Sequence, residues 1–134
     1  MAEGINELHL LNRTLSKADA LAKALSPTCP VSIHALSDTE CLKTCDLVIN
    51  TTSIGLKETL NDSPILTFEW VRKDQLSVDI IYNPPQTKFL KSVSEKGGDT
   101  LNGVGMLAGQ GILAFNLFTG KKAAYNDFKE RILH

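Results

Sequence analysis

Short apolar runs that alternate with helix-like segments most constrain how this chain can fold. The runs lie at Leu8–Leu11, 31–36, 45–50 and 77–83, and helical spacing of apolar side chains begins directly after the first run, at 15–25. Strands that alternate with helices predict a parallel sheet, because each parallel connection has to cross over a face of the sheet. We therefore expect an α/β fold with helices on both faces of a Rossmann-like sheet.

The C-terminal third of the chain predicts mainly helices. A helix with Phe89, Leu90 and Val93 facing inward is expected before Gly97, and 99–105 should form a short strand or turn. A very apolar helix then ends at Gly120, because glycine is the usual residue just after a helix. An amphipathic helix is expected at 123–133, with Ala124, Phe128 and Ile132 spaced four apart.

The composition excludes several classes of function. The chain has 134 residues, which suit one domain, and a formal net charge of −1. A nearly neutral chain offers no electrostatic basis for binding nucleic acid or an anionic membrane. No apolar run reaches transmembrane length, and the first residues lack a signal-peptide pattern. We therefore expect a cytoplasmic protein with no nucleic-acid or membrane partner.

The cysteines indicate thiols rather than a disulfide framework. Cys29, Cys41 and Cys45 are odd in number and irregular in spacing. Cys41 and Cys45 are four apart and, with His34, leave zinc open as an alternative. Structural zinc normally takes four ligands and no fourth is evident, so buried thiols and no metal are the favoured interpretation.

Polar residues follow the apolar runs at the point where each predicted strand ends. They are Asn12–Thr14 after the first run, 50–53 after the third and Tyr82-Asn83 after the fourth. In parallel sheets ligands bind at the carboxyl ends of the strands. Arg13 suits the 2'-phosphate of NADP, and Lys17 adds a second positive charge. Taken alone, both cations are better interpreted as solvated charges after a strand.

Four segments resemble the shikimate dehydrogenase family, in the family's order. "NRT" followed by "KA" lies at 12–18, "INTTSIGL" at 49–56, "VDIIYNPPQTKFL" at 78–90 and "LNGVGMLAGQGILAFNLFTG" at 101–120. Glutamyl-tRNA reductases share "NRT" but not the last two segments. The resemblance implies that 1–134 is the C-terminal NADP-binding domain of an oxidoreductase of aromatic amino-acid biosynthesis, which interconverts 3-dehydroshikimate and shikimate with NADPH.

The resemblance also assigns roles to individual residues. The residues implied at the adenosine 2'-phosphate are Asn12, Arg13, Thr14 and Lys17. The residues implied to line the cofactor further along are Thr51, Thr52, Ser53, Ile80 and Gly103. The residues implied at the substrate are Tyr82 and Gln110. Gln110 also lies among apolar residues of its helix, so we expect a buried amide that needs a partner.

Some positions depart from the family pattern. Thr51 stands where alanine is common, Ser53 where proline is common and Leu56 where methionine is common. Shikimate and quinate dehydrogenases share these segments, so the resemblance leaves a broader substrate range open. Arg13 favours NADP over NAD.

The family's N-terminal substrate domain, first strand and glycine-rich loop have no counterpart here, so we expect about half of a family member. The catalytic Lys/Asp pair would then lie outside this chain. The family's first strand is central in its sheet, so its neighbours, here 8–11 and 45–50, should have unpaired inner edges that invite association with a second copy. The alternative function is a non-catalytic binding or assembly module.

Overall fold

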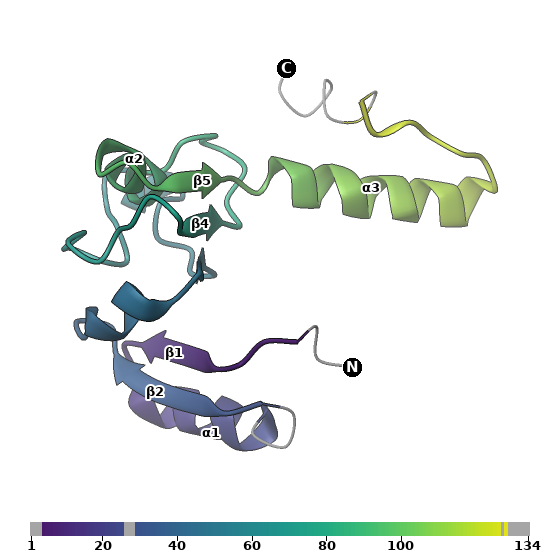
Figure 1. Cartoon of the computed structure of the whole chain (residues 1–134). Helices are drawn as coiled ribbons and strands as arrows, with labels where there is room; N and C mark the ends of the chain where they lie inside the picture. Colours follow the sequence, from purple (N-terminus) through teal and green to yellow (C-terminus); the bar gives the residue numbers. More distant parts are fainter. Residues whose placement is uncertain (1–3, 26–28, 127, 129–134) are drawn as a thin grey trace. The chain divides into compact units, whose positions relative to one another are not determined.

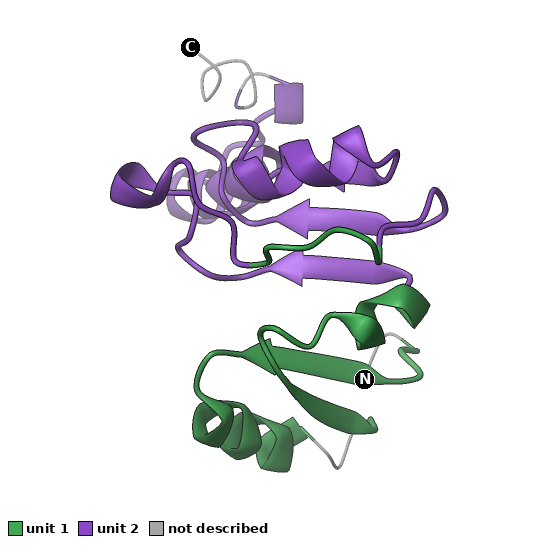
Figure 2. Ribbon diagram, turned by 90° about the vertical axis from the view of Figure 1, so that its left-hand side faces the viewer, with its two compact units in different colours: residues 1–45, 65–70 green, residues 46–64, 71–134 purple. Residues whose placement is uncertain are grey.

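The computed structural model describes residues 4–25, 29–126 and 128. The chain divides into two compact units, which Figure 2 distinguishes by colour. Unit 1 comprises Met1–Cys45 and Ile65–Trp70, and unit 2 comprises Asp46–Pro64 and Val71–His134. Each unit contains its own parallel sheet.

Unit 1 is a βαβ unit followed by a short 3-10 helix. Its elements are β1 (Leu8–Asn12), α1 (Leu15–Leu25), β2 (Val31–Ala35) and η1 (Glu40–Thr44), as Figure 1 shows. β1 and β2 pair in parallel, with Leu8 opposite Val31 and Asn12 opposite Ala35. α1 buries Ala18 and Ala22, one helical turn apart, as a helix that packs along one face must.

Unit 2 carries three parallel strands and two α-helices. Its elements are β3 (Leu47–Asn50), η2 (Lys57–Thr59), β4 (Leu76–Asp79), α2 (Lys88–Glu95), β5 (Asp99–Leu101) and α3 (Val104–Thr119). The strand order is β3–β4–β5. α2 supplies the predicted apolar face, because Phe89, Leu90 and Val93 are all buried. This face and buried β-strand residues such as Val48 form the core of the unit.

The predicted parallel α/β class is confirmed, and so are the unpaired strand edges. Among the described residues, β1 pairs only with β2 and β3 pairs only with β4, so the strands form two sheets. No described strand pairs with both β1 and β3, so the two sheets are not joined by backbone hydrogen bonds. Both strands therefore present backbone N–H and C=O groups along one edge.

α3 is the apolar helix predicted from the sequence, and Gly120 ends it with a left-handed backbone (φ 66°). The helix buries Val104 and Ala108 but exposes Leu117 by 80% and Phe118 by 84%. Within the described ranges, no helix has the length and hydropathy needed to span a membrane. The helix predicted at 123–133 lies largely outside the described residues.

Candidate functional site

The predicted phosphate-binding residues occupy the turn between β1 and α1. Asn12 ends β1, and its Nδ2 donates a hydrogen bond to the Thr14 carbonyl oxygen at 3.2 Å. The same carbonyl oxygen accepts from the Lys17 backbone N–H at 3.1 Å and from Ala18 at 3.4 Å. Thr14 thus occupies the N-cap position of α1, and the Asn12 amide braces the turn that carries Arg13.

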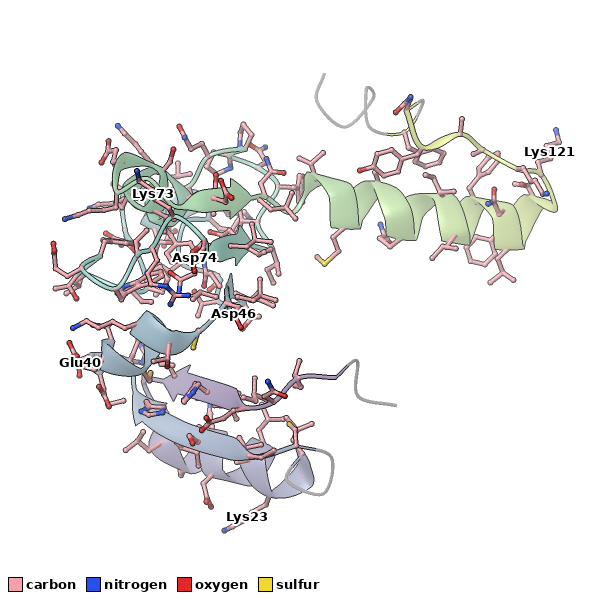
Figure 3. All side chains as sticks on the ribbon, viewed as in Figure 1. Lys23, Glu40, Asp46, Lys73, Asp74 and Lys121 are labelled. Carbon is pink, nitrogen blue, oxygen red and sulfur yellow. The ribbon has the colours of Figure 1, made fainter. Side chains whose placement is uncertain are left out.

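The electrostatics of this turn favour an anion. Arg13 and Lys17 are exposed, and neither forms an ion pair with a carboxylate in the described part of the chain. The first turn of α1 contains no acidic residue. Asp19, the acidic residue of α1, pairs instead with Lys23, which Figure 3 labels. These two cations lie beside the positive end of a helix, and a phosphate group would supply the negative partner that they lack among the described residues.

The predicted cofactor residues Thr51, Thr52 and Ser53 are exposed and follow the carboxyl end of β3. Buried Asn50 holds this segment, because its Oδ1 accepts hydrogen bonds from the Thr52 N–H at 3.0 Å and from the Thr52 hydroxyl at 2.8 Å. The Thr52 hydroxyl in turn accepts from the Ile54 N–H at 3.2 Å. The loop is therefore pinned at Thr52, while its exposed side lies open to solvent.

A buried polar network that the sequence analysis missed joins the ends of β3, β4 and α2. The carboxylate of Asp79 is fully buried and accepts from Asn50 Nδ2 at 3.1 Å, the Thr87 hydroxyl at 2.7 Å and the Ile81 N–H at 3.1 Å. Thr87 also accepts from the Leu90 N–H at 3.4 Å and caps α2. A carboxylate inside the otherwise apolar run "VDII" was the available signal, since a buried charge requires several partners.

Gly103 lies against the end of β4, beside Ile80. A Cβ at Gly103 would lie 2.0 Å from the Ile80 carbonyl oxygen, so no larger residue fits without moving the backbone. The Gly103 N–H donates to the Ile81 carbonyl oxygen at 2.9 Å. This contact sets the start of α3 against β4, and it gives Gly103 a packing role independent of any cofactor.

The two predicted substrate residues are both exposed, which differs from expectation for Gln110. Tyr82 is 46% exposed, just after β4. The prediction of a buried Gln110 amide is wrong, because Gln110 is exposed on α3. The reason is geometric: α3 buries the face that carries Val104 and Ala108, and a residue two positions after Ala108 lies on the opposite side of the helix.

The predicted site residues therefore fall into two groups, one in each unit. Unit 1 holds Asn12–Thr14, which lead from β1 into α1, and Lys17 in the first turn of α1. The remaining residues belong to unit 2 and follow β3 and β4 or lie on α3. Within unit 2, the Ile80 N–H donates to the Asn50 carbonyl oxygen at 3.2 Å, which fixes the two strand ends side by side.

The three cysteines are thiols, as expected, but only Cys29 is buried. Cys41 and Cys45 are half-buried. Burial raises the pKa of the Cys41 thiol, and the neighbouring Cys45 and Asp38 raise it further.

The sequence matches one protein family. Residues 103–133 match the family model of the shikimate 5'-dehydrogenase C-terminal domain. The chain is 37% identical over 130 residues to the NADP(+) shikimate dehydrogenase of Methanococcus aeolicus, covering 96% of this chain and 47% of that protein. The chain thus spans about half the length of the curated relatives it matches.

Solved structures agree with this match. A shikimate dehydrogenase in complex with NADP+ has a TM-score of 0.83 and 34% identity over 96% of this chain and 46% of its own. The Listeria monocytogenes enzyme in complex with shikimate and NAD has a TM-score of 0.85 and 25% identity over 97% of this chain and 48% of its own. In sequence and in fold, this chain therefore matches the C-terminal part of the shikimate dehydrogenase family.

Proposed function

We propose that this chain is the NADP-binding part of a shikimate dehydrogenase, an oxidoreductase that interconverts 3-dehydroshikimate and shikimate. The observation that carries the proposal is the uncompensated positive charge of Arg13 and Lys17 at the N-terminus of α1. A guanidinium and a helix N-terminus together suit a phosphate, which accepts several charge-assisted hydrogen bonds.

The same turn favours NADP over NAD. NAD sites place a carboxylate at the end of this strand to bind the ribose 2'-hydroxyl, whereas an arginine accommodates the 2'-phosphate. The residues between Asn12 and Lys17 include no acidic side chain. In this proposal Arg13 is the main determinant, Lys17 adds charge, and the Asn12 and Thr14 polar groups hold the turn in place.

In unit 2, further residues are assigned to the cofactor and to the substrate. The exposed hydroxyls of 51–53 line the cofactor, and Ile80 and Gly103 flank the nicotinamide. The nicotinamide supplies the hydride. Tyr82 and Gln110 contact the substrate, and their exposure leaves both side chains accessible to it. The buried Asp79 network keeps these strand ends rigid, as a preorganised site requires.

The residues assigned here include no proton-transfer pair, so we infer that this chain alone does not turn over. An NADP-linked oxidation assay, run with shikimate and with quinate, tests this inference. Turnover by the isolated chain would contradict it, and the ratio of the two rates would then give the substrate preference.

Titration with adenosine 2',5'-bisphosphate and with AMP tests the phosphate site directly, because the two probes differ only in the 2'-phosphate. We expect chemical-shift changes at Arg13 and Lys17 with the bisphosphate alone. Arg13→Gln should weaken its binding about 10- to 100-fold, since a hydrogen bond to a charged group contributes about 1.5–3 kcal/mol. The matched control is Lys43→Gln, which removes an exposed cation paired with Glu40 at 2.8 Å. Equal binding of both probes would refute the assignment.

A second candidate function is a non-catalytic assembly module. The open edges of β1 and β3 favour it, because unpaired strand edges recruit further strands. In this case the chain forms homo-oligomers through these edges. Size-exclusion chromatography with light scattering tests it: a concentration-independent monomer would exclude edge-mediated assembly.

A further inference from the structure

Two histidines of unit 1 lie on one face of the β1–β2 sheet. His9 is opposite Ser32 in the register, and His34 is two residues beyond Ser32 on the same strand, so both side chains leave the same face. His9 Nδ1 lies 3.0 Å from His34 Nε2, and the ring centroids are 5.1 Å apart. Both rings are half-buried.

A thiol completes the cluster. Cys41 lies on η1, the 3-10 helix whose Glu40 is labelled in Figure 3. The Cys41 Sγ and one nitrogen of each histidine all lie within 4.8 Å of one another. Three side chains of two types that transition metals favour, imidazole and thiol, therefore converge from three separate elements of one compact unit.

The outer nitrogens of both rings face carboxylates. His34 Nδ1 lies 3.1 Å from Asp38 Oδ2, and His9 Nε2 lies 3.6 Å from Glu7 Oε2. A carboxylate holds the imidazole proton on its own side, which directs the lone pair of the other nitrogen away from it. Asp38 is at hydrogen-bond distance of His34 Nδ1, and when His9 also carries its proton on the side of Glu7, the lone pairs of His9 Nδ1 and His34 Nε2 face each other at 3.0 Å. Such a pair is repulsive unless a cation, either a proton or a metal ion, lies between them.

We propose that His9, His34 and Cys41 form a binding site for a divalent transition metal, and that Zn²⁺ is the ion bound in the cell. Tetrahedral zinc with bonds of about 2.0–2.1 Å separates two ligand nitrogens by about 3.3 Å, close to the spacing of these two. Nitrogen and sulfur donors favour zinc over magnesium or calcium, which require oxygen. Three protein ligands leave a fourth position for water.

The site would tie η1 to both strands of the sheet. The ligands come from β1, β2 and η1, so they lie close together only in the folded unit. The metal therefore binds the folded state in preference to the unfolded chain. Its binding therefore raises the thermal midpoint of the chain, by an amount that grows with metal concentration. The site lies apart from the residues assigned to NADP, since it includes none of them.

Titration of the untagged, chelator-treated full chain with Co²⁺ tests the site. We expect one Co²⁺ per chain, a thiolate-to-cobalt charge-transfer band, the visible bands of tetrahedral cobalt, and loss of all of them when Zn²⁺ is added. Asp38→Asn removes an outer carboxylate and should weaken binding about 10- to 100-fold. His34→Gln and Cys41→Ser remove ligands and should weaken it further.

Cys45→Ser is the matched control, because it makes the same chemical change four residues from Cys41 and should retain the charge-transfer band. His9→Gln serves as the second ligand variant if Cys41→Ser does not fold. The proposal is overturned if the wild-type chain shows no charge-transfer band, if the band survives Cys41→Ser, or if Cys45→Ser removes it while His9→Gln does not. Binding of Cu²⁺ together with no detectable binding of Zn²⁺ would overturn the assignment to zinc.

Discussion

The carboxyl ends of β1 and β4 are both strand ends in parallel sheets, but their charges are handled in opposite ways. After β1, Arg13 and Lys17 are exposed and have no carboxylate partner among the described residues. At the end of β4, Asp79 is fully buried and accepts three hydrogen bonds from its own chain. The carboxylate that holds the fold is satisfied by hydrogen-bond donors of its own chain, whereas the cations proposed to bind a phosphate have no such partner among the described residues.

Removing the buried Asp79 carboxylate, a hydrogen-bond acceptor, is expected to have the largest effect on the free energy of unfolding. Asp79→Ala leaves the Asn50 amide, the Thr87 hydroxyl and the Ile81 N–H without their acceptor. The free energy of unfolding should fall by at least about 3 kcal/mol, because each buried unsatisfied donor costs about 1–3 kcal/mol. Urea denaturation measures this loss.

Asp74→Ala is the matched control for this prediction. The Asp74 side chain is 76% exposed and pairs with Arg72 at 3.0 Å, so its removal should leave the unfolding free energy nearly unchanged. Similar losses in the two variants would show that the buried network does not hold unit 2 together. Thr87→Val provides a milder version, which removes one of the three donors together with the side-chain cap of α2.

A methyl group at the start of α3 should be the next most disruptive change. Gly103→Ala places Cβ 2.0 Å from the Ile80 carbonyl oxygen, which forces α3 away from β4. We expect a loss of about 1–3 kcal/mol in the unfolding free energy, the usual cost of overpacking. Gly109→Ala, in the same helix with nothing within 4 Å of the added Cβ, should instead stabilise the chain by about 0.5–1 kcal/mol. Loss of stability in both variants would contradict the specific contact.

The smallest expected change in unfolding free energy tests the exposed cations that follow β1. Thr14 stands at the N-cap position, directly before α1, and Lys17 stands three residues later, where a glutamate would complete a capping box. Lys17→Glu should therefore raise the unfolding free energy by about 0.5–1 kcal/mol, through the cap and the helix dipole. The same variant should bind adenosine 2',5'-bisphosphate more weakly than the wild-type chain does.

Thermal unfolding and the phosphate titration, run on the same Lys17→Glu protein, check both halves of this prediction. Lys17→Gln is its control, because it removes the cation without adding a cap charge. A glutamate variant that is less stable than the wild-type chain would mean that Lys17 serves the fold and not the ligand.

The sequence by itself determined the class of fold and the order of its elements. Alternating apolar runs and helical spacing are local patterns, so they predicted β1, α1, β2 and α2 and the glycine that ends α3. Four segments, at 12–18, 49–56, 78–90 and 101–120, carried the family resemblance that the comparisons confirmed.

Only the tertiary structure decided which polar residues are buried and which side chains meet. The exposure of Gln110 depends on which face of α3 packs, and the Asp79 network joins residues up to 37 positions apart, from Asn50 to Thr87. His9 and His34 are 25 residues apart and meet only because β1 and β2 pair in one register. Such contacts between distant residues depend on packing and strand pairing, which local sequence patterns do not encode.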